Sequence, residues 1–461
     1  MDQELREQLV ELRRDLHQHP EPAWCEFYTT ARIIEAIREI GVDDLYLGED
    51  VVTAADRMAV PPESELSAWR EQAIQDGADP ELVEQMADGF TGAIAVLRRG
   101  EGPTVGLRVD IDALRRSESG DPDHRPAAEG FRSTHPETMH ACGHDAHAAF
   151  GVGVLATIAA SGFEGTLKVF FQPAEEQVGG GKAIATSGHL DDVDALLAVH
   201  VGLDHPTGEI VAGIDGFLAV KHLEATFSGT AAHAGGRPNE GANANQAVAT
   251  AASQLYAIPR HEDGATRVNA GEIHGGTASN IIAEDAELIG EVRGETTALK
   301  DYMWDKATRV VEHAAGMHGC EATVTTAGEA PSATSDQALV DIVLGVAREL
   351  EGVESPIERD ELGGSEDATY LMQRVQEQGG LATYVGVGTD HPGGHHTATF
   401  DVDEDSIPIG VDLLAGAIER IATDGPHHRT EATPVENDPG EETSPAASDG
   451  AASDEQPNPT E

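Results

Sequence analysis

Apolar residues at three- and four-residue spacing predict two helices at the start of the chain. Leucines form a single stripe along 4–17, and isoleucines repeat in the same way along 30–40. The segment His19–Pro22 separates the two helices, because its prolines interrupt helical hydrogen bonding. The segment 49–90 is mostly polar, with helical stretches at 66–75 and 80–86, and we interpret it as an insertion over the core.

Short apolar runs that alternate with helical patterns predict a mostly parallel α/β sheet. The runs lie at 92–97, 104–110, 167–171, 195–199 and 382–387. Helical patterns lie at 145–161, 182–187, 336–350 and 366–378.

A different pattern separates the two parts of this sheet. Segments 222–227, 267–272 and 286–293 alternate apolar and polar residues, as half-exposed antiparallel strands do, and 242–258 and 297–315 are helical. We therefore predict a catalytic α/β domain built from 1–212 and 331–425, with an α+β lid or dimerisation domain inserted at 213–330. The acidic tail 426–461 is expected to be disordered, since it has almost no apolar residues beyond alanine.

The net charge of the chain argues against two classes of binding partner. Lys and Arg number 29 against 83 Asp and Glu, a net charge of −54, which repels nucleic acids and anionic membrane surfaces. No apolar run approaches the roughly 18–20 residues of a membrane span. The N-terminus lacks a basic region followed by an apolar stretch, so we expect a cytoplasmic protein. The three cysteines are too few and scattered for a disulfide framework.

Lysine is rare: only residues 168, 182, 221, 300 and 306 are lysines. An acidic surface poor in lysine is favoured in a cytosol at molar salt, where a Debye length of about 3 Å screens self-repulsion. We interpret the chain as a halophile's protein.

Candidate metal ligands form four clusters, each at the end of a predicted strand or on a loop leaving one. The clusters are Met139–His147, with Cys142 and His144; Phe170–Glu176, with Glu175 and Glu176; His200; and Gly393–His396, with His395 and His396. Each cluster alone is compatible with an ordinary loop or a structural histidine. Their shared placement at strand ends instead favours one common binding site, because α/β sheets bind ligands at the carboxyl ends of their strands.

The residue types indicate a metal-dependent hydrolase. Cysteine, histidine and glutamate form a mixed set suited to Zn²⁺, Mn²⁺ or Co²⁺. Five ligands exceed what one tetrahedral ion needs, which favours two ions about 3.5–4 Å apart. A spare carboxylate beside a ligating one can act as general base toward a water molecule.

Four motifs in this order resemble the M20 metallopeptidase family, in its amidohydrolase branch. The motifs are Met139–Asp145, Phe171–Glu176, Gly229–Ala234 and Gly276–Asn280. The resemblance runs from about residue 5 to 424. Within the branch, Arg13–His17, the insertion at 49–90 and Gly364–Thr369 look most like the p-aminobenzoyl-glutamate hydrolases.

The resemblance implies roles for individual residues. The implied metal ligands are Cys142, His144, Glu176, His200 and His396. His396 is preferred to His395 because it stands four residues before Phe400, as the family's ligand stands before its aromatic residue. Glu175 matches the general base. His233 and Asn280 match residues that bind substrate and stabilise the tetrahedral intermediate, often across a dimer interface, and Asp110 and Asp112 match a carboxylate pair.

The expected enzyme therefore carries two divalent ions, Mn²⁺ or Zn²⁺, and cleaves the amide bond of an N-acyl amino acid. A homodimer is expected, and the other arrangement is a hetero-oligomer that contains a paralogous subunit. Two alternatives stay open at this point: a dipeptidase or aminopeptidase of the same family, and a catalytically silent metal-binding subunit.

Overall fold

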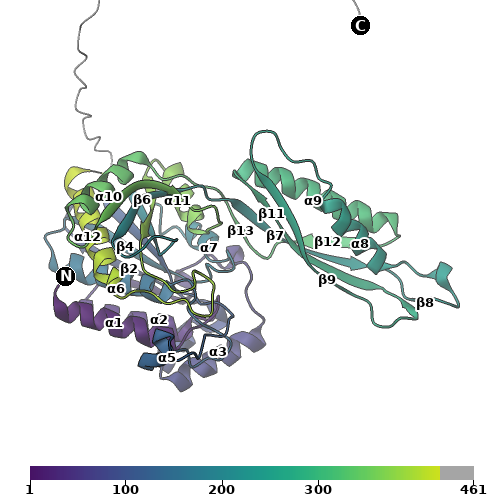
Figure 1. Ribbon diagram of the computed structural model, residues 1–461, viewed down its shortest axis with the longest axis horizontal. Coiled ribbons are helices and arrows are strands. Elements are labelled where there is room, and N and C mark those ends of the chain that lie inside the picture. Colours follow the sequence, from purple (N-terminus) through teal and green to yellow (C-terminus); the bar gives the residue numbers. More distant parts are fainter. Residues whose placement is uncertain (426–461) are drawn as a thin grey trace, which may run out of the picture. The chain divides into compact units, whose positions relative to one another are not determined.

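The computed structural model describes residues 1–425, so the predicted disordered tail lies outside the described residues. Its largest element is an eight-stranded sheet (Figure 1). In spatial order the strands are β1 (Asp44–Leu47), β2 (Ala93–Arg99), β4 (Gly165–Gln172), β3 (Thr104–Asp110), β5 (Ala195–Val201), β15 (Leu381–Val387), β6 (Glu209–Asp215) and β14 (Ser355–Glu361). Four of the seven pairings are parallel, which confirms the predicted α/β class.

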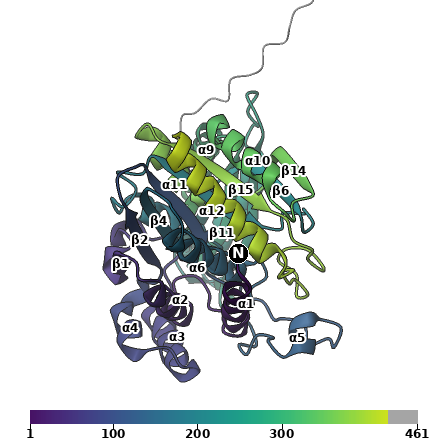
Figure 2. The ribbon, with the colours of Figure 1, turned by 90° about the vertical axis from the view of Figure 1, so that its left-hand side faces the viewer.

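Helices cover both faces of this sheet. One layer contains α6 (His144–Ala160), α10 (Gln337–Glu349) and α12 (Ser406–Asp424), with α1 (Gln3–Gln18) and α2 (Phe27–Ile40) packed against α6. Figure 2 looks onto this layer. On the other side of the sheet in Figure 1 lie α7 (Gly181–Ala185) and α11 (Ala368–Glu377). Strands covered on both faces are apolar throughout, which is why short apolar runs predicted them.

The inserted residues form a second sheet with its own core. Its antiparallel strands are β12 (Glu321–Thr325), β7 (Ala219–Ser228), β11 (Asp285–Gly294) and β9 (Thr266–Gly275), and β13 (Glu329–Ala330) also pairs with β7. The helices α8 (Ala244–Leu255) and α9 (Thr297–Met317) pack on this sheet and on each other. A small ribbon of β8 (Ala232–His233) and β10 (Ile281–Ile282) extends it. These elements form the predicted α+β unit.

Several elements differ from the sequence expectation. The sequence patterns did not predict the helix α12 or seven of the strands, which are β1, β6, β8, β10, β12, β13 and β14. The strand β6 belongs to the large sheet and runs across the boundary predicted at 212/213. Its partner β14 is an edge strand with mostly polar, partly exposed residues, so it carries little of the apolar signal that reveals buried strands. The division into domains at 213 and 330 stays a prediction.

The insertion at 49–90 contains the expected helices, α3 (Glu63–Asp76) and α4 (Pro80–Gln85), and a further short helix, α5 (Arg125–Glu129), follows β3. Among residues 1–425, no helix is both long and apolar enough to cross a membrane.

Candidate metal centre and catalytic site

The five predicted metal ligands meet beside the ends of β4 and β5. Cys142 and His144 flank Gly143, whose φ of +88° lets the loop turn directly into α6. A Cβ atom at Gly143 would lie 2.4 Å from the side chain of Val201, so glycine also allows this loop to approach β5.

Short distances connect these ligands. Cys142 Sγ lies 3.4 Å from His200 Nε2. One oxygen of Glu176 lies 3.9 Å from His144 Nε2, and its other oxygen lies 3.6 Å from His396 Nε2. Among the groups of possible ligand atoms that lie within 4.8 Å of one another, two consist of predicted ligands alone, and they share Cys142. One set contains Cys142, His144 and His200, and the other contains Cys142, Glu176 and His396.

The donor atoms fit divalent metal ions. His144 Nε2 and Glu176 Oε1 are buried and have no hydrogen-bond partner among residues 1–425. His144 Nδ1 donates to the backbone oxygen of Asp112 at 2.9 Å, and His200 Nδ1 donates to that of Val201 at 2.7 Å. These bonds fix the tautomers so that both Nε2 lone pairs face the cluster, as metal-binding histidines require. Thiolate, imidazole and carboxylate groups together suit Zn²⁺ or Mn²⁺.

The structure favours His396 over His395 as the fifth ligand. His395 Nε2 accepts a hydrogen bond from Leu203 N at 3.0 Å, which leaves the proton on Nδ1, 3.6 Å from Cys142 Sγ. Neither ring nitrogen of His395 is then free to bind a metal. His396 has a strained φ of +58°, and its backbone N donates to Ala141 O at 2.8 Å, which attaches its loop to the loop of Cys142.

Glu175 lies beside these two sets and joins another, with His144 and Glu176, whose ligand atoms also lie within 4.8 Å of one another. It is buried, and desolvation raises the pKa of its carboxyl well above the usual range, with Glu366 and Glu176 raising it further. Asp112 fixes the backbone of the loop that follows β4. Its two carboxylate oxygens accept hydrogen bonds from Glu175 N at 3.1 Å and from Glu176 N at 3.0 Å. The preceding Ala174 has a φ of +60°, a conformation that turns the two carboxylates into the site.

A second layer of side chains supports the ligands, and sequence motifs revealed only part of it. His147 lies one helical turn after His144, pairs with Asp110 through Nδ1, and accepts from Val201 N at 2.8 Å through Nε2. The i, i+3 spacing of the two histidines was a usable signal for this role. The buried Arg108 binds Asp110 and also Glu366, at 2.9 Å. No local pattern in the sequence links residues so far apart.

His233 and Asn280 lie together but away from the ligands. Ala234 N donates to Asn280 O at 2.9 Å, where β8 and β10 pair, and both residues are exposed. The ten-residue strand β7 spans about 30 Å and separates this ribbon from the end of the sheet next to the ligands. Within one chain, His233 does not line the cavity described next.

A cavity of about 550 Å³ opens over the ligand cluster. It contains Cys142, Glu175, Glu176, His200 and His396. In the described part of the chain, Arg293, near the end of β11, is the only arginine or lysine among its lining residues. This volume lies in the range typical of small-molecule sites.

Comparison with known proteins identifies the family. Residues 106–420 match the model of Peptidase family M20/M25/M40. The chain belongs to this family. It is 41% identical over 412 residues to the indole-3-acetyl-aspartic acid hydrolase of Enterobacter agglomerans, covering 88% of this chain and 94% of the relative. It is also 41% identical to one subunit of the p-aminobenzoyl-glutamate hydrolase of Escherichia coli (strain K12), covering 87% and 93%.

A solved structure extends the match to three dimensions. The crystal structure of the aminobenzoyl-glutamate utilization protein from Klebsiella pneumoniae is 35% identical, with a TM-score of 0.78, and the match covers 91% of this chain and 96% of that one. The predicted family is confirmed, and with it the prediction of an amidohydrolase.

Proposed function

We propose that this M20 enzyme is a metal-dependent amidohydrolase that releases an acidic amino acid from its N-acyl derivative. The observation that supports this proposal is a buried carboxylate, Glu175, next to five convergent candidate metal ligands, four of which line one cavity with it. The relatives named above act on p-aminobenzoyl-glutamate and indole-3-acetyl-aspartate, which share an aromatic acyl group and an acidic amino acid.

The ligand set of Cys142, His144, Glu176, His200 and His396 would hold two divalent ions, Mn²⁺ or Zn²⁺. When bound, such ions supply Lewis acidity, which polarises a carbonyl group and makes water a stronger nucleophile at neutral pH.

Glu175 is the proposed general base. Its burial raises its proton affinity, which suits it to accept the proton of the attacking water. The same carboxyl group can then return the proton to the departing amine. The hydrogen bonds of Asp112 to the backbone of Glu175 and Glu176 keep the base and the ligand at fixed positions relative to each other.

Arg293 is the proposed partner of the substrate's carboxylate. It is partly exposed in the cavity, and its Nη1 contacts Ser365 Oγ at 3.3 Å. Its other nitrogens bind Glu291 at 2.8 and 2.9 Å, which fixes the orientation of the guanidinium. A fixed guanidinium in an acidic protein provides selective attraction for an anionic substrate.

His233 and Asn280 are proposed to act on the substrate of a second subunit, since they lie away from the cavity of their own chain. The strand β9 is an edge strand of the small sheet, and Ile273 on it and Ile281 nearby are 49% and 45% exposed. An edge with exposed apolar side chains is suited to pairing with another copy. The Escherichia coli relative is named as one subunit of its hydrolase, which keeps a hetero-oligomer as the other arrangement.

Two variants test the assignment of base and ligand. Glu175→Gln should retain metal and KM while kcat falls by about 10²–10⁴-fold. Glu176→Gln should lose metal and recover part of its activity at high metal concentration. Metal loss in the first variant and not the second would show that the roles are exchanged, and full activity in both would refute the mechanism. The assays use p-aminobenzoyl-glutamate, hippurate, N-acetyl amino acids and dipeptides at high salt, so a dipeptidase would be recognised.

Mixing inactive subunits tests the role of His233. A His233→Ala variant and a Glu175→Gln variant should each be impaired, and subunit exchange between them should restore activity if His233 acts on the partner's substrate. Absence of any recovery in verified mixed dimers would refute catalysis across the interface.

A further inference from the structure

A second cavity also reaches the proposed ligand Glu176, and the proposed mechanism does not use this cavity. Its volume is about 440 Å³, and among the described residues Glu176 alone lines both this cavity and the one over the ligands. Its apolar walls come from Pro22, Ala23, Ala59, Pro61 and Leu114. The side chains of Glu65 and Arg115, which form an ion pair, also line it.

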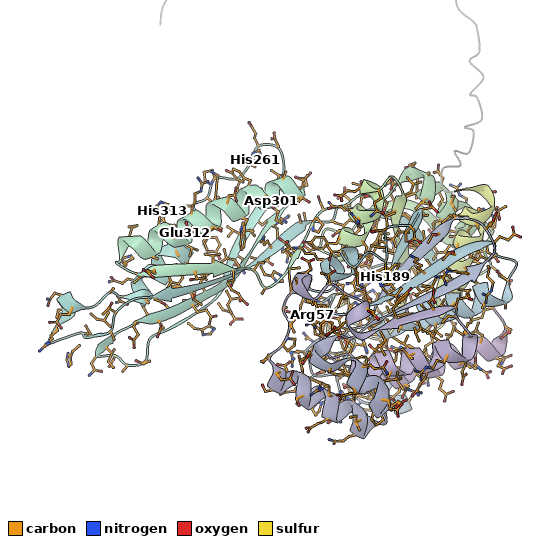
Figure 3. All side chains as sticks on the ribbon, turned by 180° about the vertical axis from the view of Figure 1, so that it is seen from behind. Arg57, His189, His261, Asp301, Glu312 and His313 are labelled. Carbon is orange, nitrogen blue, oxygen red and sulfur yellow. The ribbon has the colours of Figure 1, made fainter. Side chains whose placement is uncertain are left out.

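The insertion at 49–90 builds one wall of this cavity, and its loop is firmly attached. Trp24 Nε1 donates to Met58 O at 2.7 Å, and Met58 N donates to Gly179 O at 3.3 Å, three residues after Glu176. Arg57, labelled in Figure 3, places its guanidinium 3.7 Å from the centre of the Phe90 ring. The wall is therefore fixed to the segment that carries the ligand.

Another part of the wall, formed by Pro22 and Ala113, is connected to the segment that carries Glu175 and Glu176. Ala113, next to Asp112, forms a β-bridge with Pro22, and its backbone N donates to Glu21 O at 2.8 Å. Asp112 in turn binds the backbone of Glu175 and Glu176. The second cavity and the proposed catalytic site thus share one framework of hydrogen bonds.

We propose that this second cavity is the acyl-group subsite, and that it selects planar aromatic acyl groups bearing an N–H donor. The proposal rests on the proposed function. Arg293 lies in the first cavity and Glu65 in the second, so a substrate whose amide bond lies at Glu176 would place its carboxylate toward one and its acyl group toward the other. Proline, alanine and leucine walls suit a flat ring. Arg115 binds Oε1 of Glu65, and Oε2 can accept a hydrogen bond from an aromatic amine or indole N–H.

Three variants test the subsite. Pro61→Trp fills the cavity, and Pro62→Trp is the matched control, because Pro62 is exposed and does not line it. Glu65→Gln removes the negative charge from the acceptor. Each metal-loaded protein is assayed with p-aminobenzoyl-glutamate and benzoyl-glutamate, and direct binding of p-aminobenzoate and of glutamate is measured by calorimetry.

Pro61→Trp should weaken p-aminobenzoate binding at least tenfold and leave glutamate binding within twofold, while Pro62→Trp changes neither. Glu65→Gln should reduce the preference for p-aminobenzoyl over benzoyl substrates by about tenfold, the effect of one hydrogen bond to a charged group. Equal losses for both ligands, or unchanged p-aminobenzoate binding in Pro61→Trp, would overturn the subsite. A wild-type protein that binds p-aminobenzoate in this cavity but hydrolyses no N-acyl amino acid would refute the proposed function alone.

Discussion

The buried Arg13 of α1 connects two segments that carry proposed metal ligands. Its Nε lies 2.7 Å from Asp145, the neighbour of His144, and its Nη2 lies 2.5 Å from Asp401, which follows Phe400. Arg13 is fully buried, and both carboxylates are nearly so. Replacing Arg13 by Met would keep most of the side-chain volume and leave two buried carboxylates without this partner.

The loss of unfolding free energy in Arg13→Met depends on which partners Asp145 and Asp401 keep. Breaking a buried ion pair by removing one partner destabilises a protein by about 3–5 kcal/mol. His17 still binds Asp145 at 2.8 Å, and Arg125 still binds Asp401 at 2.7 Å, so we expect the lower end, about 3 kcal/mol. With an unfolding entropy of about 2.1 cal/mol/K per residue, a cooperative unit of about 420 residues would melt roughly 3–4 °C lower.

Urea unfolding at high salt measures this effect, and the adjacent arginine is the matched control. Arg14 is 32% exposed and binds Glu129, which is 44% exposed, and Glu404, which is 13% exposed, so Arg14→Met should lower the free energy of unfolding by about 1 kcal/mol, less than Arg13→Met does. Arg13→Met should also lower metal affinity, because the loops of His144 and His396 lose a common anchor. If the two variants are equally stable, the reasoning from burial is refuted.

Three other measurements check separate features. Burial alone would raise the pKa of Glu329, but the hydrogen bond from Lys221 and the charge of Lys300 lower it to about 2, below the ordinary 4.5. The stabilisation is therefore present above about pH 4.5, and the advantage of the wild type over Glu329→Gln should shrink as the pH falls from 5 to 3; a constant difference would contradict this. Thermal stability should rise from low to molar salt as repulsion among 83 acidic residues is screened, and a constant melting temperature would refute the halophile interpretation. Chelation should lower the melting temperature, and Mn²⁺ or Zn²⁺ should restore it, whereas no change on chelation would contradict the metal site.

The sequence by itself determined most helices and buried strands and the candidate site residues that follow those strands. Buried strands and amphipathic helices have periodic side chains, so β3, β4, β5, β15 and most helices could be predicted. Cys142 and His144, and likewise Glu175 and Glu176, are neighbours along the chain. Because parallel strands bring their carboxyl ends to one edge, these local clusters could be expected to meet.

The tertiary structure decided the features that depend on contacts between distant segments. The polar edge strand β14 has no periodic apolar signal, since one side of it faces solvent. His395 and His396 are the same residue type, and the structure adds to the spacing before Phe400 a physical reason for choosing His396, the hydrogen bond from Leu203 N to His395. The packing of separate segments also places His233 outside the cavity over the proposed ligands of its own chain. It likewise forms the second cavity, which Glu65 lines. Periodicity records whether a residue is buried, whereas the identity of its distant partner is fixed only when the chain has folded.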